Sequence, residues 1–153
     1  MKRSLAVVAL MSAVLATAGV AHADELKFET ELSGAEEVPP VETEGEGEAK
    51  FESDETSVDF ELKWNDLTTP AFAAHIHCGV TGVNGPVGVT LFAGTMGTEG
   101  EVQSTFTGPD PGNACGWEDL ADVLGAMATG GAYVNVHTMQ HPGGEVRGRV
   151  AAA

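Results

Sequence analysis

Apolar and polar residues alternate with a period of two along most of this chain. In the clearest run, residues 57–65, apolar side chains alternate with polar ones, at Val58, Phe60, Leu62 and Trp64. Successive side chains of a β-strand point to opposite faces, so this run predicts a strand with one buried and one solvated face. The same reasoning predicts further strands at residues 27–32, 49–51, 71–78, 87–91, 102–106, 132–138 and 145–150. An acidic, glycine-rich loop is expected at residues 42–48.

One segment has helical periodicity instead. Residues 117–128 are predicted to form a helix, with acidic residues near its start and two glycines after its end. Its apolar stripe consists of Leu120, Val123, Leu124 and Met127. About eight short strands, glycine-rich turns and one short helix predict an all-β fold, an antiparallel Greek-key β-sandwich or barrel.

The first 23 residues have the pattern of a cleaved secretory signal peptide. Lys2 and Arg3 precede an apolar run, and Ala21, His22 and Ala23 supply a small-x-small cleavage site. Residues 24–153 are then expected to form a single domain, and no later segment is apolar for long enough to span a membrane. We therefore expect an exported protein, periplasmic or extracellular.

The expected mature chain is strongly acidic. Cleavage removes two of the seven Lys and Arg residues and none of the 23 Asp and Glu residues, which gives a formal net charge of −18. Binding to nucleic acid or anionic lipid depends on Lys and Arg, so this composition argues against both partners. A negative charge of this size is typical of a well-solvated surface and would also attract cations, but it identifies no ligand.

The chain contains two cysteines, Cys78 and Cys115. An even number of cysteines in an exported protein favours a disulfide between them. The alternative is that Cys78 serves as a thiolate metal ligand beside two histidines, with Cys115 unpaired.

The four histidines of the expected mature chain lie in two short stretches. His75 and His77 are two residues apart on one predicted strand, and His137 lies on another. If these strands are neighbours, the three imidazoles converge, and such a set of nitrogen donors suits copper or, as the alternative, zinc. His141, Cys78 or a water could supply a fourth ligand, although His141 lies in a turn and also fits a plain surface residue. Without a metal, the histidines could form a hydrogen-bonded structural network with Tyr133 and Asn135.

Five short motifs, in this order, resemble the CHRD domain, a module named from the developmental protein chordin and common in exported bacterial proteins. They are LSGAEEVPP (32–40), AHIH (74–77), NGPV (84–87), YVNVHT (133–138) and GEVRG (144–148). The resemblance implies a compact β-sandwich in which both histidine-bearing strands belong to the common core. The motifs include Tyr133, Asn135, Glu145 and Arg147, to which we assign structural roles, with Arg147 expected to pair with an acid. Cys78 and Cys115 are not part of these motifs.

Three functions remain open at this point. The first is an exported CHRD module that binds copper through its strand-borne histidines, and the second is a metal-free adhesion or protein-interaction module. The third is a small redox enzyme, because the histidine motifs resemble, in spacing only, the copper ligands of copper–zinc superoxide dismutases. No serine lies in a Gly-x-Ser-x-Gly motif and no phosphate-binding loop is present, so we expect no catalytic residues and favour binding over catalysis.

Overall fold

The computed structural model describes residues 25–153. The predicted signal peptide, residues 1–23, lies outside the described residues. The elements are β1 (Leu26–Ser33), a 3-10 helix η1 (Gly34–Glu36), β2 (Glu46–Ser53), β3 (Val58–Asn65), β4 (Ala71–Cys78), β5 (Val87–Ala93), β6 (Gly100–Phe106), α1 (Leu120–Thr129), β7 (Ala132–Thr138), β8 (Val146–Arg149) and β9 (Ala151–Ala152). Within the described residues, no helix has the length and apolar character needed to cross a membrane.

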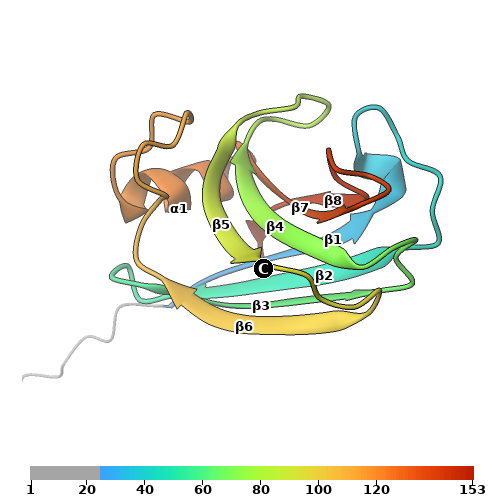
Figure 1. Cartoon of the computed structure of the whole chain (residues 1–153). Helices are drawn as coiled ribbons and strands as arrows, with labels where there is room; N and C mark the ends of the chain where they lie inside the picture. Colours follow the sequence, from blue (N-terminus) through green and yellow to red (C-terminus); the bar gives the residue numbers. More distant parts are fainter. Residues whose placement is uncertain (1–24) are drawn as a thin grey trace, which may run out of the picture.

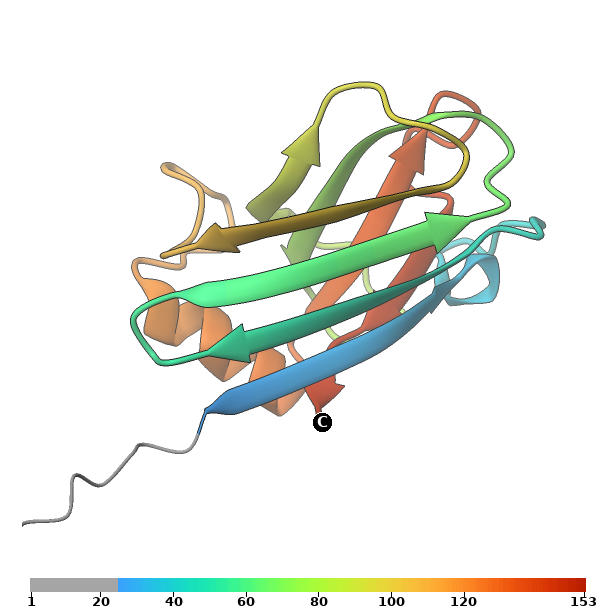
Figure 2. The ribbon, with the colours of Figure 1, turned by 90° about the horizontal axis from the view of Figure 1, so that it is seen from below.

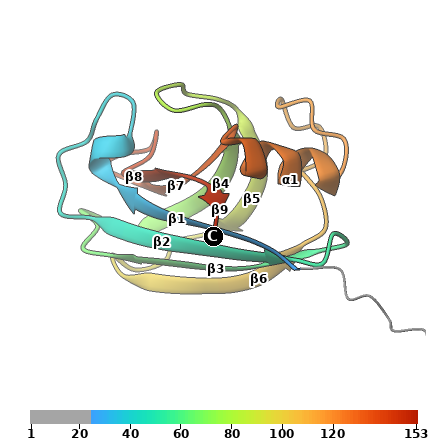
Figure 3. The ribbon, with the colours of Figure 1, turned by 180° about the vertical axis from the view of Figure 1, so that it is seen from behind.

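The strands form one antiparallel sheet that folds into two layers. The strand order is β5-β4-β7-β8-β1-β2-β3-β6, with β9 beside β1. Figure 1 shows β5, β4, β7 and β8 above β1, β2, β3 and β6, and the lower layer faces the viewer in Figure 2. Helix α1 lies at one end of the sandwich, near β9 (Figure 3). The predicted antiparallel all-β fold with one short helix is confirmed.

The core lies between the two layers and follows the alternation of the sequence. In β3 the residues Val58, Phe60, Leu62 and Trp64 are buried, as predicted. The second strand is longer than predicted, because residues 46–48 of the expected acidic loop pair with the end of β1. Their charged side chains stay on the solvent face, so the acidic composition does not prevent strand pairing.

Helix α1 begins three residues later than the sequence pattern predicts. Asp119 is its N-cap, and its carboxylate accepts a hydrogen bond from the backbone N–H of Asp122. Trp117 is held before the helix by Asn113, whose side chain bonds both its N–H and its C=O. At the other end, Gly130 adopts a left-handed conformation (φ 73°), which stops the helix where the two glycines predicted it.

Cys78 and Cys115 form a disulfide with a Cα–Cα distance of 5.8 Å. The predicted bond is therefore confirmed, and the alternative of a Cys78 thiolate ligand is wrong. The bond ties the end of β4 to the segment that precedes α1, and the chain-entropy model assigns about 4 kcal/mol to a loop of this length.

Glu145 is fully buried and joins three loops. One carboxylate oxygen accepts hydrogen bonds from the Thr43 hydroxyl and the Thr68 N–H, and the other from the hydroxyls of Thr68 and Thr138, all at 2.7 Å. These donors lie before β2, before β4 and at the end of β7. Burial raises the pKa of the Glu145 carboxyl, but the hydrogen bonds together outweigh this effect and hold the pKa below its ordinary value of 4.5. The structural role assigned to Glu145 thus has a physical basis.

We expect Glu145→Gln to lower the free energy of unfolding by about 1–3 kcal/mol at pH 7. The neutral amide loses the charge that strengthens these buried hydrogen bonds, and its NH₂ group cannot accept the bonds that one carboxylate oxygen now accepts. A carboxylate whose pKa is lowered by folding stabilises the fold above its unfolded pKa, and this contribution disappears as the pH falls through the folded pKa. The difference between the two proteins should therefore shrink when urea unfolding is repeated near pH 3. Glu44→Gln, at an exposed loop acid, is the control. A difference that grows on acidification would contradict this account.

Candidate metal centre

The pairing of β4 with β7 brings the three predicted histidines to one face of the sheet. Ala73 pairs with His137, His75 with Asn135 and His77 with Tyr133. The alternating residues of both strands, Ala74, Ile76, Val134 and Val136, are buried in the core. The two strands are neighbours, as the metal hypothesis requires, and the imidazoles occupy the face opposite the core.

The three imidazoles lie close enough to share one ion. One nitrogen atom from each of His75, His77 and His137 lies within 4.8 Å of the other two. His75 Nδ1 and His137 Nε2 are 2.9 Å apart. Nitrogen atoms that bind one ion at about 2.0–2.1 Å lie within about 4 Å of each other, so only a small side-chain movement is needed.

Backbone carbonyls fix the tautomers of two of these histidines. His77 Nδ1 lies 2.9 Å from the Gly85 oxygen, and His137 Nδ1 lies 3.0 Å from the Pro142 oxygen. A carbonyl oxygen only accepts hydrogen bonds, so each Nδ1 carries the proton and each Nε2 keeps its lone pair. His77 Nε2 is buried and has no hydrogen-bond partner within the described residues. Metal-binding histidines have this arrangement, in which the second nitrogen donates to an outer partner.

The surroundings also keep the imidazoles neutral. Burial lowers the pKa of His75 to about 4, assisted by His137 and His77 and opposed by Asp110. Burial likewise lowers the pKa of His77 and of His137, against the hydrogen bonds that they donate to Gly85 and Pro142. Since only the neutral ring offers a lone pair, the cluster can bind a cation at neutral pH.

Hydrogen bonds from Arg147 and Asn135 hold the β4–β5 loop and the β7–β8 loop beside this face. Arg147 donates to Asn84 Oδ1 at 3.0 Å and to the Val83 oxygen at 2.7 Å, and Asn135 donates to the Gly143 oxygen at 3.3 Å. Arg147 makes no ion pair within the described residues. The expected pairing with an acid is replaced by hydrogen bonds to the β4–β5 loop.

The comparisons with known proteins agree with this architecture. A family model described as the CHRD domain matches residues 28–150, which begin within β1 and end one residue after β8. The chain belongs to the CHRD family. No curated protein and no solved structure matches it. The family is thus established over most of the chain, and the CHRD domain must be interpreted from its own geometry.

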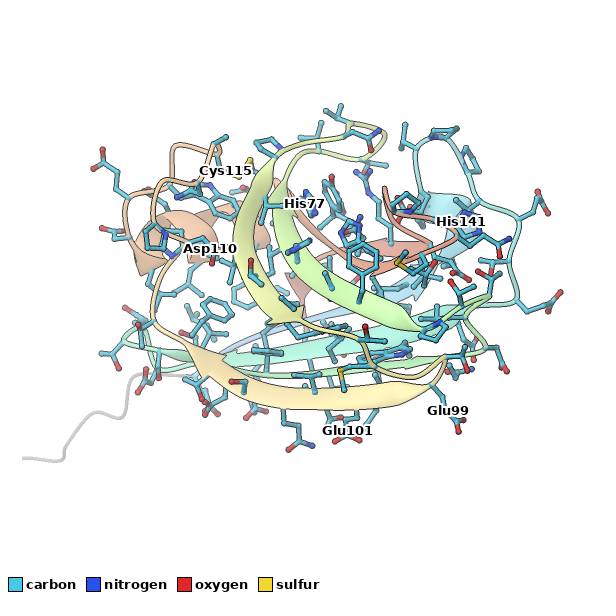
Figure 4. All side chains as sticks on the ribbon, in the orientation of Figure 1. His77, Glu99, Glu101, Asp110, Cys115 and His141 are labelled. Atoms are coloured by element: carbon cyan, nitrogen blue, oxygen red, sulfur yellow. A yellow bond between two sulfur atoms is a disulfide. The ribbon has the colours of Figure 1, made fainter. Side chains whose placement is uncertain are left out.

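His141 is the one histidine of the CHRD domain that does not join the cluster. Among residues 25–153, the group whose nitrogen atoms can share an ion consists of His75, His77 and His137. In Figure 4, His141 lies to the right of His77, and Cys115 and Asp110 lie to the left of His77. His141 is half-buried, and its Nε2 has no hydrogen-bond partner within the described residues. Its assignment as a fourth ligand stays a prediction.

Sequence reasoning missed Glu37, which it treated as part of an irregular connector. The side chain is buried and lies beside Asn135, and one of its oxygens has no hydrogen-bond partner within the described residues. Burial raises the pKa of Glu37 to about 7, although the Arg147 charge opposes this effect. Its place in the LSGAEEVPP motif was the only available signal, because an acid in an acidic segment usually indicates a solvated position.

We expect Gly144→Ala to destabilise the CHRD domain by about 1–3 kcal/mol. Gly144 has φ 126°, and a Cβ there would lie 2.3 Å from Glu37 Oε1 and 2.5 Å from Asn135 Nδ2. Gly143→Ala is the matched control, since its Cβ would meet nothing within 4 Å. Urea unfolding of both variants measures the difference. Equal stabilities of the two variants would show that this contact does not constrain the turn.

Proposed function

We propose that the protein is an exported metal-binding CHRD module that holds copper, or zinc as the alternative, through His75, His77 and His137. Its role would be to bind, store or pass on the metal outside the cytoplasm. The observation that carries this proposal is the cluster itself, three neutral imidazoles on one face with nitrogen atoms within 4.8 Å of one another.

The donor set favours copper or zinc over other common ions. Imidazole nitrogen suits both metals, whereas magnesium and calcium prefer oxygen ligands. Copper(II) binds nitrogen ligands more tightly than zinc does in the general order of divalent ions, which supports copper as the first choice. The cysteine nearest the cluster, Cys78, is bonded to Cys115 and supplies no thiolate.

Two features support export. The disulfide between Cys78 and Cys115 is compatible with an oxidising compartment. The pattern of residues 1–23, with basic, apolar and small-residue parts in order, is that of a cleaved signal peptide.

The charge distribution favours metal binding over dismutase-type turnover. A dismutase must attract an anion to its metal, whereas the chain from residue 24 onward has a formal net charge of −18. Asp110 acts on His75 as a negative charge, since it raises the pKa of that histidine. Both effects assist the approach of a cation and oppose that of an anion. The metal-free interaction module remains the alternative, in which the same histidines only stabilise loops.

We expect the purified, metal-free protein to bind one equivalent of copper(II), and zinc(II) more weakly, in calorimetric titrations with glycine present as a weak competitor. His77→Ala should remove this stoichiometric binding because it deletes one of three ligands. His141→Ala should retain it, and this variant is the matched control because His141 lies outside the cluster. Stoichiometric binding that survives His77→Ala, or no binding by the wild-type protein, would refute the proposal.

A further inference from the structure

Three planar side chains from three adjacent strands form a stack that begins at His77. The rings of His77 (β4) and Tyr133 (β7) are nearly parallel, with an interplanar angle of 8° and centroids 4.9 Å apart. The Arg147 guanidinium (β8) lies 3.4 Å from the centroid of the Tyr133 ring. Because β7 lies between β4 and β8 in the sheet, Tyr133 separates the Arg147 charge from His77.

The same two residues hold the carbonyl that fixes His77. The Gly85 oxygen lies 2.9 Å from His77 Nδ1 and also accepts a hydrogen bond from the Tyr133 hydroxyl at 3.3 Å. The Gly85 N–H donates to the Tyr133 hydroxyl at 3.1 Å. Arg147 donates to the two preceding residues of the loop, Val83 and Asn84. Thus both the ring plane and the protonated nitrogen of His77 depend on Tyr133 and Arg147.

The other two histidines lack this support. His75 is only partly buried and its one hydrogen bond within the described residues goes to His137. His137 is held by the Pro142 carbonyl, and the phenyl ring beside it, that of Phe72, is tilted at 43° with its centroid 6.0 Å away. His77 is therefore the histidine whose orientation is most fully determined before any ion arrives.

We propose that Tyr133 and Arg147 are positioning residues that hold His77 in its ion-binding orientation and tautomer, and thereby set the metal affinity of the site without touching the metal. This inference rests on the proposed function. Partners that orient metal ligands in this way change metal affinity by about 10- to 100-fold when they are removed.

The test compares variants of Tyr133 and Arg147 in three measurements. Competition titration gives the copper(II) affinity, nitrogen-15 NMR of the metal-free protein gives the tautomer of His77, and thermal unfolding gives the melting temperature. Tyr133→Leu removes the ring, Tyr133→Phe removes only the hydroxyl, and Arg147→Lys keeps the charge but loses the planar fork. Arg149→Lys is the matched control, because Arg149 lies on the same strand two residues away and is exposed.

We expect Tyr133→Leu and Arg147→Lys to weaken copper binding by about 10- to 100-fold, and Tyr133→Phe by a smaller factor. Each should convert the single Nδ1–H tautomer of His77 into a mixture, while Arg149→Lys should match the wild type. If Tyr133→Leu does not fold, Tyr133→Phe and Arg147→Lys still decide the question.

Two negative results are distinguishable. Wild-type protein that binds no copper refutes the proposed function, and the NMR measurement then still tests the orientation of His77. Wild-type protein that binds copper, with variants that keep the same affinity and tautomer but melt at lower temperature, refutes the positioning role and leaves Tyr133 and Arg147 as structural residues only.

Discussion

The register between β4 and β7 is the constraint on which both the core and the candidate site depend. Because side chains alternate along a strand, this register buries Ala74, Ile76, Val134 and Val136 while it brings His75, His77 and His137 together on the other face. A slip of one residue would move the apolar set out of the core and the imidazoles into it. The burial of apolar residues thus enforces the arrangement of the histidines, and the site requires no separate force to assemble it.

Two buried charged groups near this face, Glu145 and Arg147, form hydrogen bonds with loop residues. Glu145 accepts four hydrogen bonds, three of them from Thr43 and Thr68, which lie far from it in the sequence. Arg147 holds the β4–β5 loop. Buried polar groups without partners are costly, so these contacts hold the loops in one arrangement. The carbonyls of Gly85 and Pro142, which orient His77 and His137, belong to the loops held in this way. Loop stability and the proposed metal affinity are therefore linked.

Features that depend on local periodicity, on the cysteine count or on short motifs could mostly be predicted from the sequence. The alternation in residues 57–65, the shared face of His75 and His77, the Cys78–Cys115 bond and the CHRD resemblance all agree with the structure. The predicted start of the helix was wrong. The apolar pattern begins at Trp117, but Asn113 binds the backbone of Trp117 outside the helix, and the side chain of Asp119 caps the first turn. The burial of Glu37 and the partners of Arg147 and Glu145 could not be predicted, because they depend on contacts between distant loops. An acidic segment has the same composition whether one of its carboxylates is solvated or enclosed.

The central claim is that three strand-borne histidines form one metal centre, and the position of a bound ion tests it most directly. Crystals of the copper-loaded protein, measured at wavelengths on either side of the copper absorption edge, would give this position from the anomalous difference. We expect a single strong peak at about 2.0 Å from one imidazole nitrogen of each of His75, His77 and His137. A peak elsewhere, such as among the carboxylates of the β1–β2–β3 face, would contradict it.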